Sequence, residues 1–291
     1  MELGDLTDVF SLGALRGYVP IAASTINSNF SVETDRGRWF VRVNEGKAEV
    51  DVAWEARLIA ALADGGLTTP PAVHAKDGRP YAPLLGSRGK WVSVFPWRGG
   101  HHLGPADVTA DLAGALGEAL GTLHRIGLGV PPALRRGSIY DHDHLVGRYM
   151  RFAMNVDPAL EEAIEVVGEE LAIIGDSAGL RRRATNGIIH GDLFRDNVLW
   201  EDEQITAILD FEQASGGSLA YDLAVTINDW CWDGGPRIDL AAALLAGYER
   251  KRKLTAGDRD ALPIEVRAAA ARFTITRITD VYLARVHNPE K

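Results

Sequence analysis

One short stretch constrains this chain of 291 residues more than any other. It reads His-Gly-Asp-Leu-Phe-Arg-Asp-Asn-Val-Leu, so a carboxylate, Asp192, stands five positions before an amide, Asn197. A second carboxylate, Asp210, follows the β-rich residues 205–209. The polar residues 201–204 predict a turn between two short strands, which makes this region a hairpin. Such a hairpin brings Asp210 back beside Asn197.

These side chains are the ones that phosphoryl transfer requires. A carboxylate accepts or orients the proton of an acceptor hydroxyl, while an amide and a second carboxylate hold Mg²⁺ on the nucleotide phosphates. We therefore expect Asp192 to be the catalytic base, and Asn197 and Asp210 to be metal ligands. The alternative is an acidic surface loop in front of an ordinary hairpin. Apolar residues on both sides of the first carboxylate, and the second carboxylate itself, favour the catalytic interpretation.

Composition narrows the class of partner. The net charge is -9 and no basic stripe is present, so nucleic acid is not an expected partner. The single cysteine, Cys231, rules out an intramolecular disulfide and fits a reducing compartment. The first residues lack a basic region followed by an apolar one, so we expect no signal peptide, and the most apolar run, residues 241–247, is too short to span a membrane. We expect a cytoplasmic monomer or homodimer without a membrane partner.

Residues 1–95 predict a small lobe of mixed structure. Strands are expected at 29–34 and 38–43, followed by a helix over 49–63. Arg42 stands between apolar neighbours on the second strand, and Glu55 lies on the helix. A strand cation paired with a helix glutamate is the arrangement that kinases use to orient the α- and β-phosphates. Alternatively, both are surface charges.

Two further segments of this lobe are candidates for nucleotide binding. The small polar loop at 22–28 can bring backbone N–H groups and hydroxyls to phosphate oxygens, with Ser28 and Asn29 as candidate contacts. The strand 91–95 runs into Pro-Trp-Arg-Gly-Gly, which predicts a hinge between two lobes. Backbone groups near Phe95 are then available to an adenine.

Residues 96–291 predict a larger, mainly helical lobe. An apolar stripe predicts a helix that begins at Pro105 and ends at His124. Residues 213–218 predict a loop, and another helix starts at about Leu219. On that helix, Asp222 is suited to accept hydrogen bonds from the backbone around Asp192. In the small lobe, a further hairpin is expected from strands at 72–75 and 80–82, which gives an α+β fold overall.

The sequence resembles a known family. The motifs His-Gly-Asp with Asn197, Asp-Phe-Glu at 210–212, and Tyr-Asp-Leu-Ala at 221–224 are similar to those of the aminoglycoside phosphotransferase and choline kinase superfamily. The resemblance covers nearly the whole chain. It implies a bilobal protein-kinase-like fold, ATP as phosphate donor and Mg²⁺ as cofactor. It also implies that Arg42 and Glu55 form the pair that orients the phosphates.

Within that superfamily the chain most resembles the bacterial homoserine kinases. The segments that carry the likeness are 192–199, 227–231, 27–30 and 271–280. The resemblance implies transfer of the γ-phosphate of ATP to L-homoserine, a step of threonine biosynthesis. Two positions depart from the usual pattern. Glu212 stands where those kinases have an aromatic residue, and Thr274 stands where they tend to have tryptophan.

Homoserine carries an ammonium and a carboxylate beside its hydroxyl, so its pocket needs both signs of charge. Asp229 or Glu212 is expected to take the ammonium, and Arg195 or Arg272 the carboxylate. A choline-type acceptor would instead need an aromatic and acidic cage, which Trp230, Trp232 and Glu212 could build. The arginines favour homoserine, whereas Glu212 favours a more cationic acceptor. A choline, ethanolamine or aminoglycoside kinase therefore remains the alternative.

Overall fold

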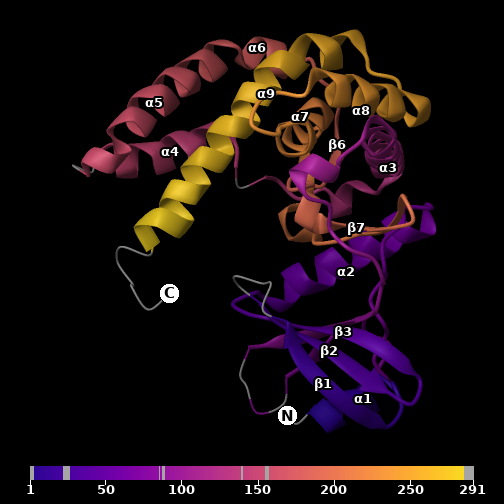
Figure 1. The fold of residues 1–291 in the computed structure, drawn as a ribbon. Coiled ribbons are helices and arrows are strands. Elements are labelled where there is room, and N and C mark those ends of the chain that lie inside the picture. The colour runs from indigo at the N-terminus through magenta and orange to yellow at the C-terminus, as the bar shows by residue number, and fades with distance from the viewer. Residues whose placement is uncertain are drawn as a thin grey trace. The chain divides into compact units, whose positions relative to one another are not determined.

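An antiparallel sheet forms early in the chain because apolar side chains alternate along it. In the computed structural model its five strands lie in the order β1-β2-β3-β5-β4. The labelled strands β1, β2 and β3 lie side by side in Figure 1. The expected strands at 29–34, 38–43 and 91–95 are all present. The strands are β1 Leu15–Ile21, β2 Ser28–Thr34, β3 Gly37–Asn44, β4 Ala82–Pro83 and β5 Trp91–Pro96.

The core of this part lies between the sheet and helix α1 (Leu3–Val9). Helix α2 (Glu49–Asp64) follows β3, begins with two acidic side chains and ends at Gly65, as expected from its apolar period. The buried side chains of the core are Leu6, Phe10, Leu12, Val32, Val41, Val43, Ala75, Ala82, Val92 and Val94.

The predicted strand at 72–75 is wrong. Pro70 and Pro71 lack backbone N–H groups, so a hydrogen-bonded ladder cannot extend through them. The N–H of Val73 does donate to the carbonyl of Val94 at 2.8 Å. The chain then closes a turn in which the N–H of Ala75 donates to the carbonyl of Arg79, also at 2.8 Å.

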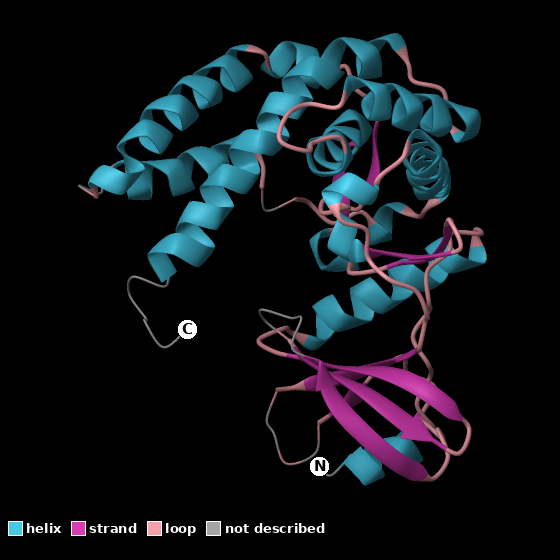
Figure 2. Cartoon of the chain, viewed as in Figure 1, coloured by secondary structure: helices cyan, strands magenta, loops and turns pink. Residues whose placement is uncertain are grey.

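The later part of the chain is mainly helical, as expected (Figure 2). Its α-helices are α3 Ala110–Gly129, α4 His142–Ala153, α5 Glu161–Asp176, α6 Ala178–Arg181, α7 Leu219–Trp230, α8 Ile238–Lys251 and α9 Ala256–Thr276. Its short 3-10 helices are η1 Pro105–Asp107, η2 Pro132–Leu134, η3 Pro158–Leu160, η4 Arg195–Asn197 and η5 Phe211–Gln213, and α9 continues into a π-helical stretch, η6 Arg277–Tyr282.

Three boundaries differ from the prediction, one of which is the end of α3, at Gly129 and not at His124. Pro105 opens only the short η1, and α3 begins at Ala110 because the hydroxyl of Thr109 accepts a hydrogen bond from the N–H of Leu112. The residues expected to form a loop at 213–218 contain β9 (Ser215–Ser218), which pairs with β6 (Asn186–Ile189). Serine and glycine have low strand propensity, so the partner strand and not the local sequence decides this element.

Helices α3 and α8 approach each other unusually closely. A β-carbon at Gly117 would lie 2.0 Å from the carbonyl oxygen of Leu244, and one at Gly247 would lie 1.9 Å from that of Gly114. Only glycine permits this contact between backbones. This close packing brings His124 of α3 within hydrogen-bond distance of Tyr248 of α8.

The structure describes residues 3–21, 27–84, 86, 89–138, 140–154 and 157–284. The chain divides into two compact units, here called the N-terminal unit (Met1–His102 with Asp196–Glu212) and the C-terminal unit (Leu103–Arg195 with Gln213–Lys291). The predicted division into functional lobes at residue 95 stays a prediction. Among the described residues, no helix is long and apolar enough to cross a membrane.

Candidate active site

Two buried charges of opposite sign meet in the N-terminal unit. Arg42 on β3 and Glu55 on α2 form an ion pair with 2.7 Å between Nη2 and Oε1. Burial alone raises the pKa of Glu55, but the charges of Arg42 and Lys47 outweigh burial and hold it below its usual value. The expected contact between the strand cation and the helix glutamate is therefore present. Its role toward phosphates stays a prediction.

A second cation in this cluster was not expected from the sequence. The ammonium of Lys47 lies 3.1 Å from Oε2 of Glu55 and 2.8 Å from Oε1 of Glu212. Arg42 also contacts Glu212, with 3.4 Å between Nη1 and Oε1, and the amide of Asn27 donates to the same oxygen. Lys47 sits in the turn between β3 and α2, three residues past the end of the strand. The only sequence feature that could have indicated Lys47 is its position just after the strand that contains Arg42.

The hairpin predicted after Asp192 is confirmed. Strands β7 (Val198–Glu201) and β8 (Gln204–Ile208) pair so that Val198 lies opposite Ile208. The N–H of Leu209 then donates to the carbonyl of Asn197 at 2.8 Å. This register places Asn197 beside Leu209, the residue that precedes Asp210, as the spacing predicted. The turn is shorter than expected, because β7 ends at Glu201 and β8 begins at Gln204.

Asp210 has an unusual backbone and an unusual acidity. Its φ of 57° lies in the left-handed region, which is strained for a residue other than glycine. Partial desolvation by the surrounding protein, and then the negative charge of Glu212, raise the pKa of Asp210 to about 6. The residue is nevertheless exposed enough for an ion to reach it. A carboxylate and an amide oxygen on adjoining strand ends are hard donors, so these two residues fit Mg²⁺.

The other predicted nucleotide contacts also lie in the N-terminal unit. The hydroxyl of Ser28 donates to Glu45 at 3.2 Å, and Asn29 lies opposite Arg42 in the ladder between β2 and β3. The ring of Phe95 packs against Phe40, and the guanidinium of Arg42 lies 5.4 Å from its centre. Residues 22–26 of the predicted phosphate loop lie outside the described residues.

The loop that contains Asp192 is held in the C-terminal unit by one carboxylate. Both oxygens of Asp222 accept backbone hydrogen bonds, from the N–H groups of His190 and Gly191, each at 2.7 Å. This confirms the expected role of Asp222. Gly191 has a φ of 78°, and a β-carbon there would lie 2.9 Å from the carbonyl oxygen of Gln213. Glycine is therefore required at this turn.

Arg272 on α9 contacts the predicted base. Its Nη1 lies 3.7 Å from Oδ1 of Asp192, and its side chain is 4% exposed. The guanidinium lies 4.2 Å from the ring centre of Tyr140 and 3.8 Å from that of Phe273. Its Nε, although buried, has no hydrogen-bond partner. Tyr140 was not predicted, because its position in the sequence carries no motif.

The remaining predicted acceptor residues are also in the C-terminal unit, except Glu212. Arg195 and Asp229 pair with each other, with 3.2 Å between Nε and Oδ2, and the N–H of Arg195 donates to the same oxygen at 2.9 Å. Trp230 is fully buried, and its indole N–H donates to the carbonyl of Leu193 at 3.0 Å. Trp230 thus supports the loop beside Asp192, and its contact with an acceptor stays a prediction.

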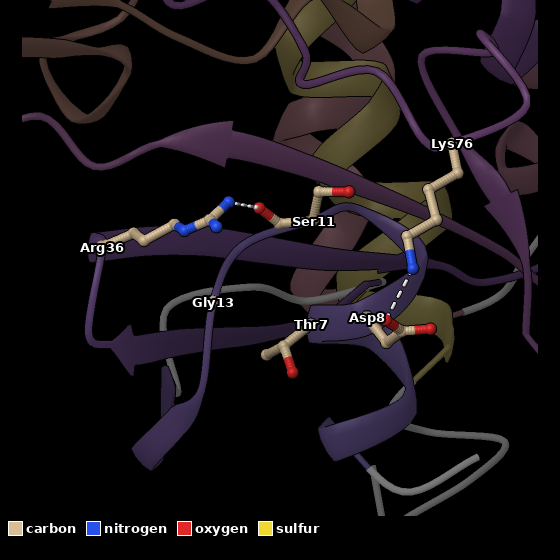
Figure 3. A pocket seen from close by; sticks show the side chains of 6 residues that line it. All are labelled: Thr7, Asp8, Ser11, Gly13, Arg36 and Lys76. Atoms are coloured by element: carbon tan, nitrogen blue, oxygen red, sulfur yellow. Dashed lines mark hydrogen bonds and ion pairs between the residues drawn. The ribbon is translucent and has the colours of Figure 1, made fainter.

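A hollow in the N-terminal unit is not part of these clusters. It has a volume of about 310 Å³, and none of the predicted site residues lines it (Figure 3). The cations in it are already engaged. Lys76 pairs with Asp8 at 2.6 Å, and Arg36 donates to the carbonyl of Ser11 at 3.0 Å. Lys76 in this hollow is therefore a cation outside the predicted site.

Comparison with known proteins identifies the family. Residues 17–254 match the family described as the phosphotransferase enzyme family. The chain belongs to this family. The phosphotransferase is 35% identical to the homoserine kinase of Caulobacter sp. (strain K31) over 286 residues, which are 96% of this chain and 86% of that kinase. It is 32% identical to the homoserine kinase of Gluconacetobacter diazotrophicus over 277 residues, 94% of this chain and 84% of the relative.

A solved structure supports the same fold. The spectinomycin phosphotransferase in complex with ADP and spectinomycin has a TM-score of 0.71 to this phosphotransferase at 18% identity, and the match covers 99% of this chain and 89% of that one. The predicted kinase-like α+β fold, with an N-terminal antiparallel sheet and a mainly helical C-terminal part, is confirmed. So is the prediction that the protein is a phosphotransferase enzyme.

Proposed function

We propose that this phosphotransferase moves the γ-phosphate of ATP to the hydroxyl of L-homoserine and so forms O-phosphohomoserine. The similarity to homoserine kinases over nearly the whole chain supports the substrate. The observation within the molecule that carries the proposal is the contact of a buried guanidinium, Arg272, with Asp192. A buried cation beside the base is suited to an acceptor that carries a carboxylate close to its hydroxyl.

On the nucleotide side, the proposal assigns the cations of the N-terminal unit to the phosphates. Arg42 uses one terminal nitrogen for Glu55 and the other for Glu212, so both are engaged within the protein. Lys47 is less buried than Arg42, with side-chain exposures of 19% and 9%, so its ammonium is the more accessible of the two cations. We assign the direct phosphate contact to Lys47, with Arg42 holding Glu55 in place. Ser28, Asn29 and the backbone near Phe95 complete the proposed nucleotide contacts.

Asn197 and Asp210 are the residues that would hold Mg²⁺. When bound, the ion neutralises charge on the transferring phosphate. A carboxylate with a raised pKa is stabilised in its charged form by a nearby cation, which agrees with this assignment of Asp210.

On the acceptor side, Asp192 accepts the hydroxyl proton. The hydroxyl oxygen bonds to the γ-phosphorus, the bond from that phosphorus to the bridging oxygen breaks, and ADP leaves. Arg272 binds the carboxylate of the acceptor, and the two rings beside its guanidinium keep the cation in position. Asp229, whose charge is shared with Arg195, is the proposed contact of the ammonium.

The test compares acceptors at matched concentration. ATP consumption is measured with homoserine, serine, threonine, choline, ethanolamine and an aminoglycoside, and homoserine should give the highest kcat/KM. Arg272→Ala should raise the KM for homoserine by about 10-fold or more, because it removes a charge-assisted contact. Arg267→Ala is the matched control, since Arg267 lies on the same helix but pairs with Glu170. A tenfold preference for another acceptor would refute the substrate and leave the kinase activity intact.

A choline-type acceptor is less well supported. Its cage would need Trp230, Trp232 and Glu212, but the indole of Trp230 is fully buried and the carboxylate of Glu212 pairs with Arg42 and Lys47, which leaves only Trp232 exposed. A cytoplasmic location and a monomeric or dimeric state stay predictions.

A further inference from the structure

A row of buried polar side chains crosses the C-terminal unit and ends at the loop of Asp192. Each contact joins one side chain to the next, and four of the five side chains are fully buried. In order, the contacts are Asp222 Oδ2 to His124 Nε2 at 2.9 Å, His124 Nδ1 to the Tyr248 hydroxyl at 2.7 Å, that hydroxyl to Arg252 Nη1 at 2.9 Å, and Arg252 Nη2 to Asp258 Oδ2 at 2.8 Å.

The far end of the row is anchored to backbone. Asp258 accepts hydrogen bonds from the N–H groups of Thr185 at 2.7 Å and Thr255 at 3.0 Å, in addition to the one from Arg252. These bonds hold the pKa of Asp258 at about 2, although burial alone would raise it. Thr185 is the residue immediately before β6, the strand that leads to the loop. Both ends of the row are therefore attached to the chain that positions Asp192.

The donors and acceptors along the row fix the direction of each hydrogen bond. Both oxygens of Asp222 accept backbone N–H groups, and although burial raises the pKa of this carboxyl, its hydrogen bonds and the charges of His124 and His190 together lower it, so Asp222 is held ionised. An ionised carboxylate only accepts, so His124 carries its hydrogen on Nε2. At the other end, the guanidinium of Arg252 only donates, so the oxygen of Tyr248 accepts from it.

The hydroxyl hydrogen of Tyr248 then has one acceptor left, which is Nδ1 of His124. Burial raises the pKa of Tyr248, so this hydrogen stays on the phenol. A doubly protonated His124 would donate from Nδ1 as well, and the phenol hydrogen would lose its acceptor inside the core. An unpaired buried group is costly, so the hydrogen bonds of the row favour Nδ1 of His124 as an acceptor.

We propose that Tyr248 and Arg252 are positioning residues for the catalytic base. They fix His124 in one orientation, His124 fixes Asp222, and Asp222 holds the N–H groups of His190 and Gly191. An apolar row of the same shape would be at least as stable, because buried polar groups contribute little net free energy. The close packing of α3 on α8 through glycine keeps the row continuous. The inference rests on the proposed role of Asp192 but not on the identity of the acceptor.

The test uses Tyr248→Phe, which keeps the ring and removes the hydroxyl. The variant should lower kcat by about 10-fold while the KM values for ATP and acceptor change less than about twofold, since one buried hydrogen bond is lost far from both substrates. Amide hydrogen exchange over residues 188–192 should become about 10-fold faster than in the wild type, and the rest of the C-terminal unit should change less.

Leu244→Val is the matched control. Leu244 lies one turn before Tyr248 on α8 and is equally buried, but it has no part in the row. It should lower the melting temperature without changing kcat or the exchange of residues 188–192. If both variants affect these two readouts equally, the row is only a structural element and the proposal is wrong.

Two further outcomes are decisive. If Tyr248→Phe fails to fold, Arg252→Lys tests the same link, because a lysine cannot span both the phenol and Asp258. Wild-type kcat and unchanged exchange in either folded variant would overturn the proposal. If the wild-type protein phosphorylates no acceptor but exchange still rises at 188–192, the positioning of the loop stands and the proposed function fails.

Discussion

Asp192 is the side chain on which turnover should depend most. We expect Asp192→Asn to lower kcat on the order of 10²-fold or more, because base-assisted proton transfer typically contributes that much. The KM for ATP and the melting temperature should change little, since the amide has nearly the same shape and the side chain is partly exposed. Steady-state kinetics with calorimetric binding of ATP measures both effects. Asp196→Asn, four residues further in the same segment, is the control, and equal losses in the two variants would remove Asp192 from the role of base.

Lys47 offers a second test at the scale of one residue. Replacing it with methionine keeps most of the volume and removes the charge shared by Glu55 and Glu212. We expect the KM for ATP to rise by about 10-fold, as for the loss of a charge-assisted contact. Lys76→Met is the control, because Lys76 is an exposed cation of the same unit that pairs with Asp8. An unchanged KM in the Lys47 variant would return the phosphate contact to Arg42.

Among the elements, the hairpin of β7 and β8 carries measurable strain. Both residues of its turn, Asp202 and Glu203, have positive φ, at 46° and 62°. This is the geometry that favours asparagine followed by glycine. We expect Glu203→Gly to raise the free energy of unfolding by about 1 kcal/mol, because glycine adopts the left-handed region without steric cost.

Urea denaturation measures this change. Glu201→Gly is the opposite control, since Glu201 lies in β7 and glycine weakens a strand. That variant should be less stable than the wild type, while kcat should be unaffected by Glu203→Gly. A Glu203→Gly variant that is less stable than the wild type would show that contacts of the glutamate outweigh its backbone strain.

At the scale of the whole molecule, metal and nucleotide should stabilise the fold together. Asn197 and Asp210 provide too few oxygens for the octahedral shell of Mg²⁺, so the ion needs phosphate oxygens as well. We expect Mg²⁺ alone to leave the melting temperature unchanged and ATP with Mg²⁺ to raise it more than ATP with EDTA. Asp210→Ala should abolish that difference and the transfer activity.

Thermal unfolding with each ligand set provides the measurement. Asp64→Ala is the control, because it removes an exposed carboxylate at the end of α2. Should the Asp210 variant respond to ATP with Mg²⁺ as the wild type does, the metal ligands must be sought elsewhere.

Several features of the site could be predicted because they depend on neighbours along the chain. The hairpin that joins Asn197 to Asp210 follows from two β-rich runs and a polar turn. Arg42 and Glu55 were expected to meet because a strand and the helix after it lie close in space. Errors occurred where distant partners decide the structure. Residues 215–218 are a strand only because residues 186–189 pair with them.

By itself, the sequence determined the carboxylates and the amide proposed for transfer and the hairpin that joins two of them, and its resemblance to a family indicated the kinase-like class of fold. The spacing of the polar side chains and the hairpin depend on covalent spacing and local periodicity, which a sequence displays directly. Only the tertiary structure decided that Lys47 shares two carboxylates, that Arg272 contacts Asp192, and that His124 meets Tyr248 across 124 residues of chain. Such contacts depend on how closely helices pack, and that closeness is set by many side chains together rather than by any one motif.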